Sequence, residues 1–468
     1  MIKLISNVLG KLGVSLLMFA STPFLLKQFG AEQYGIIGIY IAIQMILMLV
    51  DGGFSTSYAR DLSKENDSDK KNQIASQYYT IFIKLSCVVF LLAGIIILLI
   101  LKDLSISLNV IIWMAISLSA QFMMFFYQAS YSSQGEQVKY NAIYIFYGTV
   151  RYVIVTYLVV HFNGSIADFF FYQAILTFIT CILYHNLISS LCFKLTPSLG
   201  YKASKRDNNM LMLLITTTVI YQIDKFIIFM AMGSQNLAYY SLAFSAAALP
   251  MIFISSFYYY SFPKFSNLIG KSDLEGFVKE FRFDSILLVS CILVPCIYVA
   301  YYSYDILFFW LGDQDAALAS SEVFSILVLG NLIQGALMIP YCASVAFDKV
   351  KFLLKINLAL LPILVLVQLL SAMYSSIEGV ASAWLIFNII FFLIIIFNLG
   401  REYFFDRRLV YLKEVYSLNL IISFVSIIIS DSIIKEFFGE RILILVPICM
   451  LFTLLCLFIA MRKKGLYE

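Results

Sequence analysis

Residues 76–101 read SQYYTIFIKLSCVVFLLAGIIILLIL, a run of 26 residues that contains a single charged side chain, Lys84. A bilayer core about 30 Å thick requires about 20 apolar residues of helix, so this stretch is long enough to cross it. Backbone groups in lipid must be paired within the segment, and the stretch lacks the strict alternation typical of a barrel strand. The stretch therefore predicts a transmembrane helix.

The composition of the whole chain agrees with this prediction. Of its 468 residues, 62% are hydrophobic and only 13% are charged, whereas soluble proteins have about 25% charged residues. The net charge of +4 is too small for a nucleic-acid-binding protein. The eight cysteines form no Cys-x-x-Cys pair and the two histidines are far apart, so we expect no disulfide framework and no metal site.

Further apolar runs of similar length follow along the chain, and together they predict an all-α polytopic membrane protein with about fourteen spans. The predicted spans cover residues 5–26, 35–58, 76–101, 108–130, 141–161, 168–190, 210–232, 237–260, 284–303, 321–345, 355–374, 379–398, 415–430 and 441–461.

The distribution of Lys and Arg predicts the orientation of these spans. If the N-terminus is cytoplasmic, the inner side carries 24 Lys and Arg residues and the outer side carries four. Basic residues are strongly enriched in cytoplasmic loops. We therefore expect an even number of spans with both termini in the cytoplasm.

The most polar interruption follows the sixth span and divides the chain into two halves. We expect an N-terminal lobe over 1–190, a cytoplasmic linker over 191–209, a C-terminal lobe over 210–398 and a C-terminal pair of spans over 399–468. A weak internal repeat supports two parallel halves, because Gly30 and Tyr34 precede the second span much as Gly233 and Tyr239 precede the eighth.

Six ionisable residues lie inside the predicted spans, where a charge costs at least ~2.5–3.5 kcal/mol at the helix centre. They are Lys11, Asp51, Lys84, Arg151, Asp224 and Lys225. Arg151 lies near mid-span, about 15 Å from either end at 1.5 Å per residue, and is too deep to extend to the interface. Its position on a tyrosine stripe favours a functional role.

Polar side chains at helical spacing beside these charges predict an aqueous cavity suited to an anionic headgroup. The predicted substrate-binding residues are Lys11, Arg60, Lys84, Arg151 and Lys225, the predicted ion-coupling residues are Asp51 and Asp224, and the predicted polar cavity residues are Gln44, Tyr144, Tyr147, Tyr221 and Gln222.

Structural explanations for the same charges remain open. Asp51 and Asp224 could pair with Lys or Arg across helices and hold the bundle together. Lys84 could extend its stem to the interface. Asp224 and Lys225 are about 100° apart around one helix, so they cannot both point straight into one cavity.

Motifs for catalysis are lacking from the sequence. It contains no glycine-rich phosphate loop, no Gly-x-Ser-x-Gly and no His-Glu-x-x-His. We therefore expect a protein that is not an enzyme, with no catalytic residues, no metal site and no cofactor, but with H⁺ or Na⁺ as candidates for a coupling ion.

Four sequence elements together resemble one family of transporters. They are Thr22-Pro23 through Tyr34-Gly35 to Asp51-Gly52-Gly53, then Tyr221-Gln222-Ile223-Asp224-Lys225 followed by Tyr239-Tyr240, then Pro263, and finally Ile377-Glu378-Gly379-Val380-Ala381. The chain is similar to the multidrug/oligosaccharidyl-lipid/polysaccharide exporter superfamily, and within it to the O-antigen and capsule repeat-unit flippases.

This resemblance implies two six-helix lobes around a central cavity. It implies a substrate made of an oligosaccharide repeat unit on undecaprenyl pyrophosphate, moved across the bacterial inner membrane by alternating access. Its implied partners are membrane lipids together with the glycan polymerase and chain-length machinery, and not nucleic acid. The extra spans after about residue 414 depart from many flippases, which have twelve.

Other functions are compatible with the same sequence. A cell-wall-precursor flippase or a cation-coupled small-molecule antiporter of the same superfamily would share these spans. A membrane-bound glycan polymerase or acyltransferase belongs to a different class, and it is disfavoured because no predicted outer loop is long.

Overall fold

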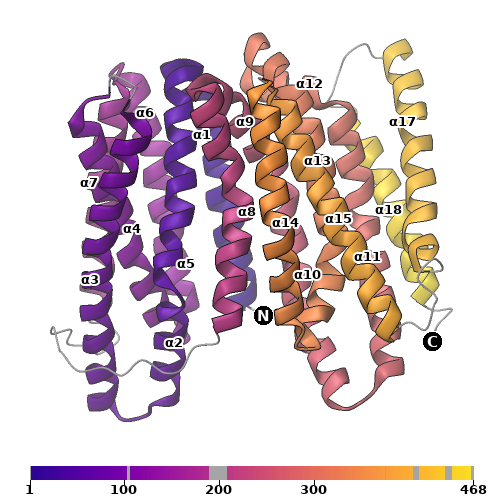
Figure 1. Ribbon diagram of the computed structural model, residues 1–468, viewed down its shortest axis with the longest axis horizontal. Helices are drawn as coiled ribbons and strands as arrows, with labels where there is room; N and C mark the ends of the chain where they lie inside the picture. Colours follow the sequence, from indigo (N-terminus) through magenta and orange to yellow (C-terminus); the bar gives the residue numbers. More distant parts are fainter. Residues whose placement is uncertain are drawn as a thin grey trace. The chain divides into compact units, whose positions relative to one another are not determined.

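The computed structural model describes residues 2–102, 106–188, 208–374, 376–403, 411–437 and 445–464, and all regular structure in these ranges is helical (Figure 1). The chain packs as two compact units, which we call the N-terminal unit (Met1–Ala238) and the C-terminal unit (Tyr239–Glu468). The predicted linker lies almost wholly outside the described residues, since 189–207 are not among them.

The N-terminal unit contains long helices joined by short turns. Its elements are α1 (Ile2–Leu47), η1 (Met48–Asp51), α2 (Phe54–Lys64), α3 (Ser68–Leu101), α4 (Leu108–Ser133), α5 (Gln137–Thr149), η2 (Val150–Ile154), α6 (Val155–His161), α7 (Ile166–Ile188) and α8 (Asn208–Met232).

The C-terminal unit also consists of helices joined by short turns. Its first helix, α9, begins within the N-terminal unit and continues into the C-terminal unit. The elements of the C-terminal unit are α9 (Ser234–Ala247), α10 (Leu249–Gly270), α11 (Leu274–Tyr301), α12 (Ser303–Leu311), α13 (Gln314–Ala346), α14 (Val350–Met373), α15 (Ile377–Tyr403), η4 (Lys413–Ser417), α17 (Leu418–Phe437) and α18 (Leu445–Lys464).

Twelve helical segments of the described chain are long and apolar enough to cross a membrane. The first of them, Gly13–Asp51, includes most of the first and most of the second predicted span. The two spans meet at Gly30, where the backbone leaves the helical conformation with φ 69° and ψ 171°. The fourteenth predicted span corresponds to α18, whose described apolar part is Ile448–Ile459. The predicted all-helical polytopic fold is therefore confirmed.

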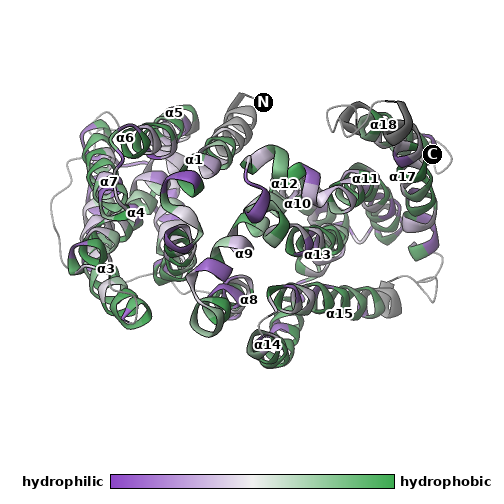
Figure 2. Ribbon diagram, turned by 90° about the horizontal axis from the view of Figure 1, so that it is seen from above, coloured by the Kyte–Doolittle hydropathy of each residue, from purple (hydrophilic) through white to green (hydrophobic). Residues whose placement is uncertain are grey.

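Aromatic side chains form much of the core of the N-terminal unit, where α4 packs against α3 and α7. The buried Tyr58 ring stacks on Phe126 at 5.0 Å and lies 4.9 Å from the ring of Tyr78. Large apolar side chains such as Leu91 and Leu99 are exposed on α3. Much of the part of α3 that is visible from above in Figure 2 is coloured as hydrophobic. Such a surface is suited to lipid.

The boundary of the N-terminal unit differs from the predicted boundary near 191–209, because α8 packs on α1. The turn after α8 lies directly against Gly35 of α1, where a β-carbon would overlap the backbone of Ser234. This close approach requires glycine and joins the seventh predicted span to the first six.

The C-terminal helices α17 and α18 pack against α11. Val294 and Tyr298 of α11 form a buried apolar cluster with Ile427 and Cys456. Hydrogen bonds add to this packing, since the Tyr298 hydroxyl donates to the Ser426 carbonyl oxygen at 2.9 Å. The final pair of spans is thus an integral part of the C-terminal unit.

Candidate functional site

The predicted key residue Arg151 lies in η2, a π-helical turn between α5 and α6. Single π-helical turns are rare and occur frequently at functional sites. The turn holds the Arg151 side chain inside the N-terminal unit, where the residue is only 8% exposed. A buried guanidinium at this depth is costly unless an anion or a set of polar groups offsets its charge.

The neighbours of Arg151 are neutral. Its Nη2 donates to Gln44 Oε1 at 3.4 Å, and its Cζ lies 5.2 Å and 6.0 Å from the ring centroids of Tyr152 and Tyr147. Arg151 Nε is buried and has no hydrogen-bond partner, and no carboxylate in the described part of the chain lies within ion-pair distance of this guanidinium. The positive charge is therefore uncompensated and has donors available for an anion.

Neutral polar groups continue from this point into the core of the N-terminal unit. The Tyr40 hydroxyl donates to Ser117 Oγ at 2.9 Å and accepts from Gln121 Nε2 at 3.0 Å. The Tyr147 hydroxyl lies 3.2 Å from Thr177 Oγ1. The network positions tyrosines beside Arg151 without supplying a negative charge.

The predicted pair Asp224 and Lys225 is buried on α8. Lys225 Nζ lies 3.1 Å from Asp224 Oδ1 and donates to the Tyr221 carbonyl oxygen at 3.0 Å. The two charges compensate each other along one helix, because the lysine stem is long enough to fold back.

Asp51 lies at the end of the first candidate span, so the prediction of a continuous helix over 35–58 is wrong. The helix breaks because Gly52 and Gly53 both adopt left-handed conformations. The Asp51 carboxylate accepts hydrogen bonds from the backbone N–H groups of Gly53 and Ser55 and from the Ser55 hydroxyl, at 3.2, 3.0 and 2.8 Å. It thus satisfies free donors where α2 begins.

The other predicted site residues are more scattered. Lys84 is exposed on α3, and Arg60 on α2 pairs with its neighbour Asp61 at 3.5 Å. Tyr144 and Tyr221 are half-buried, and Gln222 is buried. The side chain of Lys11 lies outside the described side chains. The structure thus brings Gln44, Tyr147 and Arg151 together, while the roles of all these residues remain predictions.

A charge cluster in the C-terminal unit was missing from the sequence prediction. Lys264 of α10 lies 3.0 Å from Asp284 and 2.5 Å from Glu280, both on α11. The Ser261 hydroxyl also donates to Asp284, whose side chain is 1% exposed. The sequence contained a signal for this cluster. Ser261 and Lys264 have i, i+3 spacing on α10, and Glu280 and Asp284 have i, i+4 spacing on α11, so each pair lies on one face of its helix.

Comparisons with known proteins agree with the fold. A family model described as "Polysaccharide biosynthesis protein" matches residues 2–269. A putative O-antigen transporter from Shigella flexneri is 28% identical over 172 residues, a match that covers 36% of this chain and 40% of that relative.

Two solved structures are similar over most of their length. The lipid II flippase MurJ, in an inward closed conformation, matches with a TM-score of 0.72 and 15% identity over the whole of both chains. An inward-facing MATE family multidrug resistance transporter of the MOP superfamily matches with a TM-score of 0.65 and 11% identity, over 84% of this chain and 93% of that one. Identities this low show a shared fold alone. The family model confirms the predicted resemblance to polysaccharide exporters. Because the family model covers more than half of it, the chain belongs to the polysaccharide biosynthesis protein family.

Proposed function

We propose that this membrane protein is a flippase that moves an oligosaccharide repeat unit on undecaprenyl pyrophosphate across the bacterial inner membrane by alternating access. The observation that carries the proposal is Arg151, a buried guanidinium with free donors and neutral neighbours. Family membership and the similarity to a putative O-antigen transporter support the same substrate class.

The chemistry of Arg151 matches a phosphate group. A guanidinium presents its donors in a planar fork that fits two phosphate oxygens. An empty site leaves this cation unpaired at low dielectric, so a bound pyrophosphate removes part of the cost of burying it. Gln44 and Tyr147 hold the guanidinium in place and offer neutral polar groups to the sugars.

Coupling to an ion gradient is the second part of the proposal. Asp224 and Lys225 form a buried pair that can exchange partners, with the carboxylate taking up H⁺ or Na⁺ when the lysine leaves. Asp51 is the alternative carboxylate, although its hydrogen bonds to Gly53 and Ser55 give it a structural role as well. The chain carries out no covalent chemistry and requires no cofactor in this scheme.

Location and partners follow from the same proposal. We place the protein in the cytoplasmic membrane with both termini inside, handing its product to the glycan polymerase and chain-length machinery. Reporter fusions after Lys464 and after Gln235 test the orientation, and the first should report cytoplasm and the second the outer side.

The direct test of the function is a strain that lacks the gene. Lipid-linked repeat units should accumulate on the cytoplasmic leaflet, where they stay inaccessible to a periplasmic glycan-modifying reagent. Purified protein in liposomes should move a fluorescent lipid-pyrophosphate oligosaccharide between leaflets. Normal surface polysaccharide in the deletion strain, together with inactive liposomes, would exclude the proposed function.

A further inference from the structure

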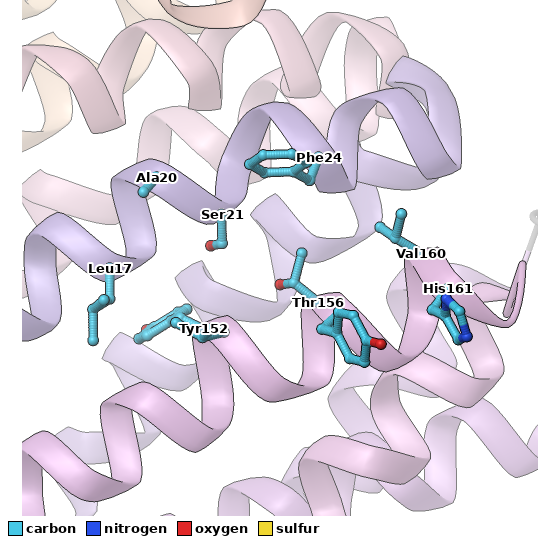
Figure 3. A pocket seen from close by; sticks show the side chains of 10 residues that line it. Leu17, Ala20, Ser21, Phe24, Tyr152, Thr156, Val160 and His161 are labelled. Atoms are coloured by element: carbon cyan, nitrogen blue, oxygen red, sulfur yellow. The ribbon is translucent and has the colours of Figure 1, made fainter.

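A groove lies between the first half of α1 and the η2–α6 segment of the N-terminal unit (Figure 3). Its volume is about 390 Å³. Leu17, Ala20 and Phe24 line it from α1, and Tyr152, Tyr157 and His161 line it from the other wall. At 1.5 Å per residue, the wall formed by η2 and α6 runs roughly 14 Å from Tyr152 to His161 at the end of the predicted span.

The lining is mainly apolar and suits a hydrocarbon chain, with Thr156 and His161 among its few polar side chains. Apolar and aromatic side chains dominate it, and the Ser21 hydroxyl is already bound to the Met18 carbonyl oxygen at 2.8 Å. Ala20, Phe24 and Tyr157 are also exposed, so the groove is open to the surrounding phase. In a membrane-spanning segment that phase is lipid, which makes a lipid chain the natural occupant.

The end of the groove at Tyr152 adjoins the uncompensated Arg151 guanidinium. Tyr152 lines the groove, and its ring centroid lies only 5.2 Å from Arg151 Cζ. One side chain therefore separates an apolar groove from a guanidinium that has free donors. An amphiphile with an anionic head and a hydrocarbon chain matches this arrangement of charge and apolar surface.

We propose that the groove binds the isoprenoid chain of the lipid-linked substrate while Arg151 binds its phosphate. This inference rests on the proposed function and adds a second contact for the same molecule. Ordinary phospholipids keep their headgroups at the interface, about 15 Å from Arg151 at 1.5 Å per residue. A lipid whose headgroup is crossing the bilayer brings a phosphate to this depth.

Photocrosslinking of the full-length protein in liposomes tests the inference. The probe is geranylgeranyl pyrophosphate with a diazirine in its chain, and peptide mass spectrometry locates the label. We expect labelling of α1 near Ala20 and Phe24 and of α6 near Tyr157. Ala20→Trp, which fills the groove, should reduce this labelling about fivefold or more, equivalent to roughly 1 kcal/mol of binding free energy.

Two matched controls make the result specific. Ala142→Trp introduces the same side chain at an exposed alanine of α5 that does not line the groove, and it should label like wild type. Phosphatidylglycerol with a diazirine in one acyl chain should label the groove much less than the pyrophosphate probe. Equal labelling by both lipids would show a general lipid contact and overturn the inference.

The failures of the two proposals are distinguishable. Undiminished labelling in Ala20→Trp, combined with active flipping by the wild type, would refute isoprenoid binding in the groove and leave the proposed flippase function standing. Strong groove labelling in a protein that moves no lipid-linked oligosaccharide would support isoprenoid binding in the groove and refute the proposed flippase function.

Discussion

Two cations of this protein, Arg151 in the N-terminal unit and Lys264 in the C-terminal unit, have opposite surroundings. In the N-terminal unit, the Arg151 guanidinium has Gln44 and tyrosines as its neighbours, and its buried Nε has no hydrogen-bond partner. In the C-terminal unit, the Lys264 ammonium is held between the carboxylates of Asp284 and Glu280. One cation is left uncompensated, and the other is more than compensated.

This difference suggests a ligand-binding role for Arg151 and a stabilising role for the Lys264 cluster. Breaking a buried ion pair leaves a bare charge, so the Lys264 cluster behaves as a unit that resists change. An uncompensated cation contributes no such stability, and we infer that Arg151 is retained for its ligand. Substitutions should therefore affect transport in the first region and folding in the second.

The largest expected effect is the loss of export in Arg151→Ala, with membrane insertion at the normal level. Arg151→Lys keeps the charge but loses the planar fork, so it should export less than wild type. Surface polysaccharide and the amount of protein in the membrane are the two measurements. Lys102→Ala, an exposed change at a helix end, serves as the control. Full export by Arg151→Ala would remove this residue from the site.

The second prediction concerns Asp224, whose pair with Lys225 resembles the compensated charges of the C-terminal unit. If Asp224 couples transport to an ion, Asp224→Asn vesicles should retain downhill substrate exchange and lose their response to an imposed pH or Na⁺ gradient. Asp51→Asn is tested in parallel. Wild-type gradient responses in both variants would refute carboxylate coupling at these positions, while loss of expression would mark a purely structural pair.

The third prediction is that Lys264→Ala destabilises the protein by about 3–5 kcal/mol, because it leaves Asp284 buried without its cation. Thermal unfolding in detergent is the measurement. The triple variant Lys264→Met, Glu280→Gln and Asp284→Leu removes all three charges, so it should recover most of the stability and export normally. A triple variant as unstable as Lys264→Ala would show that the cluster does more than balance charge.

The smallest expected effect is at the contact between α11 and α17. Asn419 Nδ2 donates to Ser290 Oγ at 3.1 Å and to the Val415 carbonyl oxygen at 3.0 Å. Asn419→Leu should lower stability by about 0.6 kcal/mol, the average measured for polar contacts between membrane helices, and by no more than about 1.7 kcal/mol, the largest such value. Ile421→Leu at a lipid-exposed position should change the unfolding temperature little. A larger loss at Ile421 would contradict this assignment of faces.

Hydropathy predicted most of the fold, because span length is fixed by the thickness of the bilayer. The predicted span 108–130 agrees with α4 at Leu108–Ser133, and 379–398 lies within α15. Hydropathy could not show where helices continue beyond their most apolar residues. It started a span at 284, whereas α11 begins at Leu274, and it therefore left Asp284 at an edge instead of inside a helix.

The candidate site was predictable only in part. The tyrosine stripe and depth of Arg151 were visible in the sequence, and its neighbour Gln44 was among the predicted cavity residues. The π-helical turn that carries Arg151 has no sequence signal that we recognised. The salt bridge between the adjacent residues Asp224 and Lys225 depends on a side-chain rotamer, which helical periodicity does not describe.

The hydrogen bonds between α11 and α17 can form only after a delay during synthesis. Tyr298 and its partner Ser426 are 128 residues apart in the chain. At roughly 5–20 residues per second, the ribosome takes about 6–26 s to add the segment that satisfies the Tyr298 hydroxyl. During that interval α11 waits in the bilayer with a hydroxyl that has no partner from α17. We therefore expect quality-control proteases to recognise the nascent protein during this interval. Chains truncated before α17 should remain susceptible to these proteases.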